Sequence, residues 1–151
     1  MKRSVLMMGG IIFLALTFVA GTILSEQAFA QNIKCCIAGK YKGVHKDIAS
    51  KTCPKPETAD FIMEIAQDQK CGSTIKGTVT DVRDGSVNSF VGTVVPGKGE
   101  CCNIQGSWKK PDEVTTFKGT LCKKDKMWSG KGTYTNKHGT TVCNGTWEMS
   151  Q

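Results

Sequence analysis

The sequence has few of the side chains from which catalytic and metal sites are usually built. It contains two histidines, His45 and His138, and both fall in segments that we expect to be loops. Its eight cysteines include no C-x-x-C pair, which excludes the common zinc and thiol-redox motifs and the C-x-x-C-H haem attachment site. A nucleophile elbow, a phosphate-binding loop and a dinucleotide-binding fingerprint are also missing. The sequence therefore nominates no catalytic residue, no metal ligand and no cofactor, and we expect a protein that is not an enzyme.

Acidic residues are fewer than basic ones, 13 against 20, which gives the chain a formal net charge of +7 at pH 7. The acidic residues are scattered, so the sequence singles out no carboxylate pair. The lysines fill outward strand positions and turn tips, where they keep a protein soluble and protect sheet edges. The same surplus would attract an anionic surface or an acidic protein partner. We expect no nucleic-acid partner, because an exported chain without an exposed aromatic platform offers bases nothing on which to stack.

The first thirty residues, 1–30, have the features of a secretory signal peptide. Lys2 and Arg3 precede a nearly uncharged apolar run over residues 5–19, and Ala28-Phe29-Ala30 fits the small-x-small rule for signal peptidase. We therefore expect cleavage after Ala30. The alternative is an uncleaved membrane anchor, since the apolar stretch is almost long enough to span a bilayer.

Cleavage would leave residues 31–151 as one exported domain, periplasmic or extracellular, with no stable membrane insertion. A chain of this length is large enough to bury a hydrophobic core. All the cysteines lie within it, and an even, high count in an exported chain indicates a disulfide framework of up to four bridges. The predicted disulfide cysteines are Cys35, Cys36, Cys53, Cys71, Cys101, Cys102, Cys122 and Cys143.

Helical periodicity is rare, and most of the chain alternates apolar and polar residues with a period of two. In residues 115–121, for example, Phe117 and Leu121 share one face, while threonine and lysine occupy the other. Such alternation is typical of antiparallel strands with one buried face, and short polar turns separate the runs. With a long connection over 44–59, we predict eight strands at about residues 36–43, 60–66, 73–81, 87–95, 100–109, 114–122, 127–135 and 140–149.

An internal repeat divides the strands into two halves, about residues 35–95 and 101–149. The stretch that begins at Cys35-Cys36 resembles the one that begins at Cys101-Cys102, and Lys76-Gly77-Thr78-Val79-Thr80 resembles Lys131-Gly132-Thr133-Tyr134-Thr135. Two four-stranded halves close naturally into a single antiparallel up-and-down barrel of eight strands, because closure removes exposed sheet edges. The predicted fold is therefore all-β and disulfide-rich, with a two-sheet β-sandwich as the alternative.

Short motifs in these strands resemble the calycin superfamily of small ligand-binding barrels, and within it the avidin-like members. The resemblance begins at Gly39-Lys40-Tyr41, in place of the family's glycine-x-tryptophan opening, and Gly106-Ser107-Trp108 repeats that opening at mid-chain. It continues through Ile75-Lys76-Gly77-Thr78 and Gly130-Lys131-Gly132-Thr133-Tyr134. The family's polar ligand constellation has no residue-by-residue counterpart here, so the resemblance implies an architecture and only faintly a function.

The phases of the strands predict an inward face that is aromatic and aliphatic and carries no charge. An eight-stranded barrel is just wide enough either to fill itself or to hold one small ligand, and both interpretations stay open. Glycines at inward positions favour free space slightly, although they also relieve bending where a barrel turns its corners. If a ligand is held, the candidate ligand-binding residues are Tyr41, Trp108, Trp128, Tyr134 and Trp147.

The same phases suggest which cysteines pair. Cysteines on one face of adjacent antiparallel strands can be joined, and cysteines in neighbouring loops can also meet. We predict Cys101–Cys122 on the outer face, Cys35–Cys143 between the closing strands and Cys53–Cys71 between the loops that flank the second strand. Counting alternate residues leaves the remaining two cysteines, Cys36 and Cys102, on opposite faces of the barrel, so we expect at least one of these phases to be wrong.

The sequence leaves three functions to weigh. The first is an exported, non-enzymatic protein that binds a small apolar or aromatic ligand inside the barrel. The second is a secreted or periplasmic inhibitor or envelope protein that binds a protein or an anionic partner through its loops and basic surface. The third is a thiol or metal function at the adjacent cysteines, which the missing C-x-x-C pair disfavours.

Overall fold

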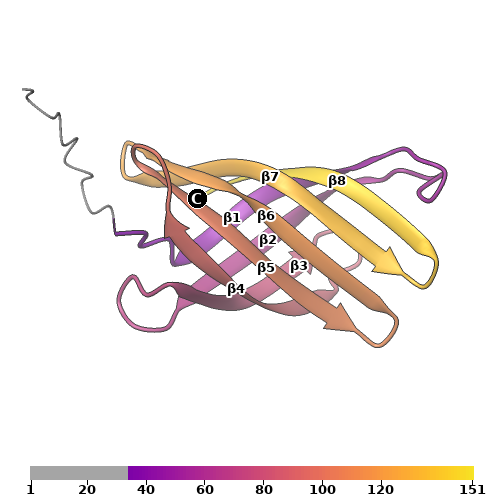
Figure 1. Cartoon of the computed structure of the whole chain (residues 1–151), viewed down its shortest axis with the longest axis horizontal. Helices are drawn as coiled ribbons and strands as arrows, with labels where there is room; N and C mark the ends of the chain where they lie inside the picture. The colour runs from indigo at the N-terminus through magenta and orange to yellow at the C-terminus, as the bar shows by residue number, and fades with distance from the viewer. Residues whose placement is uncertain (1–33) are drawn as a thin grey trace, which may run out of the picture. The chain divides into compact units, whose positions relative to one another are not determined.

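The computed structural model describes residues 34–151, and these form eight β-strands joined by short loops (Figure 1). The predicted signal peptide and its cleavage site lie outside the described residues. Among residues 34–151, no helix has the length and hydropathy of a membrane span. The strands are β1 (Gly39–Ile48), β2 (Thr58–Gln67), β3 (Thr74–Asp81), β4 (Val87–Pro96), β5 (Cys101–Lys110), β6 (Glu113–Lys124), β7 (Met127–His138) and β8 (Thr141–Ser150).

The strands follow one another round a closed antiparallel barrel, which confirms the predicted fold class and rules out the β-sandwich alternative. Each strand pairs with the next in sequence, and β8 returns to β1 in a register that places His45 opposite Trp147. Closure gives every strand two hydrogen-bonded neighbours, so the described domain has no free sheet edge.

β1 is the strand whose predicted bounds differ most from the structure. It ends at Ile48, whereas the alternation of apolar residues suggested an end at residue 43. The inward positions after Tyr41 are Gly43, His45 and Asp47, which are not apolar, so the contrast between the two faces disappears in the sequence. The long connection is correspondingly shorter than predicted and covers residues 49–57.

The inward side chains fill the barrel from one end, which we call the packed end. Tyr41 and Leu121 are fully buried there, and Phe90 and Trp128 are almost so. All of these side chains belong to the predicted inward face, which the structure confirms for the apolar residues. The side chains of the packed end are Tyr41, Met63, Ile65, Ile75, Phe90, Val94, Cys102, Ile104, Leu121, Trp128 and Met149.

Residues 35–38, which precede β1, close the packed end as a plug. The side-chain amide of Gln67, the last residue of β2, forms two hydrogen bonds with this segment. Its Nε2 donates to the Cys35 carbonyl at 2.8 Å, and its Oε1 accepts from the Ile37 amide at 2.8 Å. The Tyr41 hydroxyl donates to the Ile37 carbonyl at 2.7 Å, and the Trp128 indole donates to the Cys36 carbonyl at 2.9 Å. The plug thereby satisfies the polar groups of the two largest side chains that lie beneath it.

All eight cysteines form disulfides, but only one predicted pairing is correct. Cys101–Cys122 joins directly opposite residues of β5 and β6, as adjacent strands allow. The other two predicted pairings are wrong because they join opposite ends of the barrel. Cys35 precedes β1 and Cys143 lies near the start of the antiparallel β8, while Cys53 and Cys71 are separated by the whole length of β2.

The observed bridges connect groups that lie at the same end. At the packed end, Cys35 and Cys36 tie the plug to β5 and to the β2–β3 loop through Cys35–Cys102 and Cys36–Cys71. At the other end, Cys53–Cys143 ties the β1–β2 loop to β8. The expectation that one of the phases of Cys36 and Cys102 is wrong is not confirmed, because Cys36 is exposed and Cys102 is buried as their phases predict; the conflict arose from the wrong pairings.

Several inward glycines lie directly against aromatic rings. A Cβ on Gly119 or Gly132 would overlap the ring of Trp147, and a Cβ on Gly145 would overlap the ring of Tyr134. The space that these glycines leave is therefore filled by neighbouring rings, and the cavity described below lies elsewhere.

Replacing Gly132 by alanine is expected to lower the free energy of unfolding by about 1–3 kcal/mol, the usual cost of overpacking. The new methyl group would meet both the Trp147 ring and the carbonyl oxygen of Lys118, which cannot both give way. Urea unfolding measures the change. Ser129→Ala, on the outer face of the same strand, is the control and should change stability by less than about 0.5 kcal/mol. Equal losses in the two variants would contradict the assignment.

Candidate ligand-binding cavity

A cavity of about 420 Å³ opens at the end of the barrel opposite the plug, which we call the mouth. Four connections surround the mouth, namely β1–β2, β3–β4, β5–β6 and β7–β8, because alternate connections of an up-and-down barrel share an end. Figure 1 shows the β5–β6 and β7–β8 hairpins projecting together at this end. The barrel is therefore neither filled throughout nor hollow throughout.

Aromatic side chains form the deeper walls of the cavity. Trp108 and Phe117 lie with their ring centroids 6.0 Å apart, and Phe61, Tyr134 and Trp147 complete the aromatic lining. Three of the five candidate ligand-binding residues, Trp108, Tyr134 and Trp147, therefore face the cavity. The other two, Tyr41 and Trp128, lie in the packed end, where burial raises the pKa of the Tyr41 hydroxyl above its ordinary value.

A hydrogen-bonded chain of three inward side chains crosses one side of the cavity. The Tyr134 hydroxyl donates to the Asp47 carboxylate, and His45 Nδ1 lies 3.2 Å from the Tyr134 oxygen. Because the hydroxyl hydrogen is used on Asp47, His45 must be the donor, and its neutral ring carries the proton on Nδ1 and leaves Nε2 free to accept. Burial and the bond to Asp47 raise the pKa of Tyr134 above its ordinary value.

A second polar group, centred on Glu113, lies on the wall formed by β6 and β7. The Asn136 amide donates to the Glu113 carboxylate at 2.9 Å, and the Thr115 hydroxyl donates to the same oxygen at 3.4 Å. Lys110 lies 3.6 Å from the other carboxylate oxygen. Thr115 is only 1 % exposed and is the one buried polar side chain of the described residues.

Arg83 holds two carboxylates together at the rim. Its guanidinium contacts Glu57 at 2.6 Å and Asp81 at 2.7 Å, which joins the β1–β2 loop to the end of β3. The hydrogen bond from Arg83 lowers the pKa of Asp81, although partial burial of this carboxyl opposes the shift. The expectation that the inward face carries no charge is therefore wrong at the mouth, where carboxylates replace apolar side chains.

The predictions for the histidines are also corrected. Both were expected in loops, but His45 lies inside the barrel on β1 and His138 ends β7 at the rim of the cavity. The sequence carries no local signal for His45, because the inward residues of β1 after Tyr41 are not apolar and the contrast between the two faces disappears. The acidic residues Asp47, Asp81 and Glu113 are far apart in the sequence. They line the same cavity only because three separate strands place them at the mouth of the barrel.

His45 is expected to titrate below the ordinary histidine pKa of 6.5. Desolvation by the barrel lowers its pKa, and the nearby Asp47 and Asp81 carboxylates offset this only in part. As the pH falls below 6.5, the unfolded chain takes up this proton first, so the free energy of unfolding falls until the pH reaches the pKa of the folded state.

Nuclear magnetic resonance titration of the two histidine rings measures this shift directly, and His138→Gln assigns the two signals. In His45→Gln the loss of stability just below pH 6.5 should disappear. A ring of His45 that titrates at or above 6.5 would contradict the desolvation argument.

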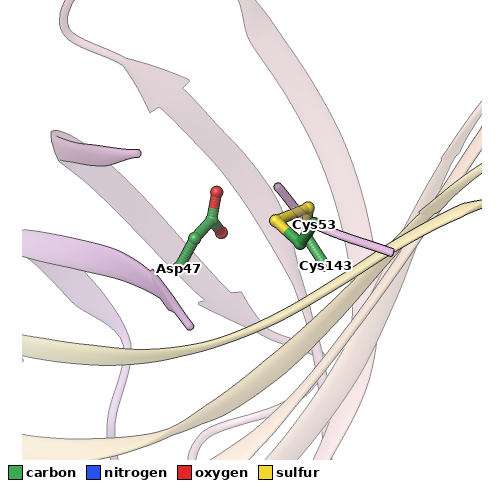
Figure 2. A group of neighbouring side chains, drawn as sticks. All are labelled: Asp47, Cys53 and Cys143. Carbon is green, nitrogen blue, oxygen red and sulfur yellow. A yellow bond between two sulfur atoms is a disulfide. The ribbon is translucent and has the colours of Figure 1, made fainter. Parts of the chain in front are cut away.

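Asp47 also lies beside the Cys53–Cys143 disulfide, and Figure 2 shows the carboxylate next to the two sulfur atoms. The three potential ligand atoms lie within 4.8 Å of one another, a spacing that could hold a metal ion. In this structure, however, the two sulfurs are bonded to each other, so they offer no thiolate to a metal. The group is therefore a structural link between the loop and β8, and the adjacent cysteines elsewhere in the chain are likewise oxidised.

Four disulfides indicate an oxidising environment for the domain. Comparison of the chain with known protein families, with curated proteins and with solved structures finds no match.

Proposed function

We propose that this protein is an exported, non-enzymatic binding barrel that holds a small molecule in the cavity at its mouth. The observation that carries the proposal is the cavity itself, with a volume of about 420 Å³ and aromatic walls at one end of a barrel that is otherwise packed. Ligand sites of small molecules usually measure about 300–1,000 Å³ and combine apolar walls with a few polar groups. The calycin-like resemblance of the strands agrees with such a role, and a closer, avidin-like relationship is part of the proposal.

The surroundings of the cavity favour a rigid site. The Cys53–Cys143 disulfide ties the β1–β2 loop to β8, and Arg83 ties the same loop to the end of β3, so this side of the mouth needs little further ordering when a ligand enters. The ligand would bury an aromatic or aliphatic body against Trp108, Phe117 and Trp147. The polar groups near the rim would then fix its orientation.

Native mass spectrometry of the protein purified from the cells that make it tests the proposal. A small molecule of defined mass should remain bound, and Val79→Phe should abolish its retention, because Val79 lines the cavity and the larger ring would occupy the site. Val91→Phe makes the same change on the outer face of the barrel, where the side chain is 65 % exposed, and should leave the ligand bound.

Circular dichroism must show that both variants keep the β-sheet spectrum. Retention of the small molecule by a folded Val79→Phe protein would place the ligand outside the cavity and refute the proposal.

Export is the second part of the proposal. The disulfides and the signal-like residues 1–30 support it, and the mature protein should begin at Gln31. N-terminal sequencing of the purified protein measures this directly. A mature chain that still carries the apolar stretch would favour the uncleaved anchor.

A second candidate function is the binding of a protein or an anionic surface by the outside of the barrel. Three exposed valines of β4, Val87, Val91 and Val95, favour it, because they alternate with Ser89 and Thr93 on the outer face of that strand. The mass spectrum that tests the first proposal distinguishes the two, since a bound protein chain and a bound small molecule differ greatly in mass.

A further inference from the structure

The cavity has the opposite charge balance to the rest of the chain. Five carboxylates line it against three cationic side chains, whereas basic residues outnumber acidic ones by 20 to 13 in the whole sequence. Arg83 is already paired with two of the carboxylates, and Lys110 lies close to a third. Asp47 forms no ion pair with any described cationic residue, and its hydrogen bonds come from the neutral Tyr134 hydroxyl and the Glu57 amide.

The hydrogen bonds of the cavity wall point to the same polarity independently of charge. Three wall groups that can donate, the Tyr134 hydroxyl, the Thr115 hydroxyl and the Asn136 amide, all donate to carboxylates of the wall. His45 donates through Nδ1 to Tyr134, which leaves Nε2 as an acceptor. The Asp47 and Glu113 carboxylates keep free lone pairs and His45 keeps Nε2, so acceptors predominate among the groups left on these residues, beside the second N–H of the Asn136 amide.

The aromatic lining is also suited to a cation. Ring faces of tryptophan and tyrosine attract an ammonium group that has lost part of its hydration, and Trp108, Tyr134 and Trp147 all face the cavity. An ammonium group has three donors and no acceptor, which matches the free acceptors of Asp47, Glu113 and His45.

Given the proposed function, on which this step rests, we propose that the cavity takes a primary amine carried on an aromatic or aliphatic body. The ammonium group binds at the Asp47 and Glu113 carboxylates of the cavity, where it can also donate a hydrogen bond to His45 Nε2. The apolar body lies against Trp108, Phe117 and Trp147. An organic anion of the same shape would meet acceptors and unpaired negative charge at these positions, so the site should discriminate strongly against it.

Three compounds of one shape and different charge test the proposal: phenethylamine, phenethyl alcohol and hydrocinnamate. Each is titrated into the full mature protein near neutral pH and low salt, and the amide resonances of the cavity-lining residues report binding. The amine should bind at least about tenfold more tightly than hydrocinnamate, with the alcohol between them. Asp47→Asn and Glu113→Gln should each reduce this preference, whereas Asp60→Asn, the same charge change on the outer face of β2, should not.

The possible failures are distinguishable. A preference that is absent or reversed, or one that survives both Asp47→Asn and Glu113→Gln, would overturn the amine assignment and leave a ligand-binding cavity of another specificity. If none of the three compounds moves the cavity resonances, the amine assignment fails, whereas the proposed function fails only if the native mass spectrum also shows no small molecule retained in the cavity.

Discussion

Replacing Cys35 and Cys102 together by alanine is expected to lower the free energy of unfolding by about 4 kcal/mol. The bridge closes a loop with a sequence separation of 67 residues, and the loss of that constraint gives the unfolded chain more conformational entropy. Both cysteines are buried, and their bridge fastens the plug to β5. The variant should therefore also open the packed end.

Urea unfolding under non-reducing conditions measures the loss, and hydrogen exchange of the Trp128 indole proton measures the opening of the plug. The control removes Cys101–Cys122, whose separation is 21 residues and whose loss should cost about 3 kcal/mol. In the control the indole proton, which donates to the Cys36 carbonyl, should stay protected. Faster indole exchange in the control than in the Cys35/Cys102 variant would show that the plug is held by something else.

Two tryptophan-to-alanine variants are expected to separate stability from ligand binding. Trp128→Ala should cost about 3–5 kcal/mol, because it empties a large part of the packed end and leaves the Cys36 carbonyl without its indole donor. Trp108→Ala should cost only about 1–2 kcal/mol, since this side chain is partly exposed at the cavity wall.

Thermal and urea unfolding of the two variants measures the first effect, and ligand titration measures the second. Trp108→Ala should weaken binding in the cavity, whereas Trp128→Phe, a milder change that keeps the packed end filled, should leave binding unchanged. Similar stability losses for Trp108→Ala and Trp128→Ala would mean that the two ends of the barrel are equally packed, contrary to the division described above.

The two ends explain how one small domain can be stable and still contain a cavity. The packed end concentrates the apolar core, three of the four disulfides and the plug, which together stabilise the closed sheet. The mouth contributes less apolar burial, and its carboxylates are held by hydrogen bonds and by Arg83. A polar cavity costs stability, and the packed end offsets that cost.

The strand pattern and the inward apolar face followed from the sequence alone. Side chains of a strand alternate between two sides, so a buried face leaves a period of two that local reading detects at Phe117, Leu121 and Trp128. Export and a disulfide framework were inferred in the same local way from residues 1–30 and from the even number of cysteines. The one correct bridge, Cys101–Cys122, joins neighbouring strands through a short connection, where sequence proximity and spatial proximity coincide.

The other bridges and the cavity were decided only by the tertiary structure. Antiparallel closure sends Cys35 and Cys143 to opposite ends, a fact that depends on strand direction and not on the face a side chain occupies. At the mouth the inner face is polar, so His45 and Asp47 carry no hydrophobic contrast by which a local pattern could assign them. Asp47, Asp81 and Glu113 line one cavity because closure of the barrel brings the ends of three non-adjacent strands to the same mouth, and no local property of the sequence records this arrangement.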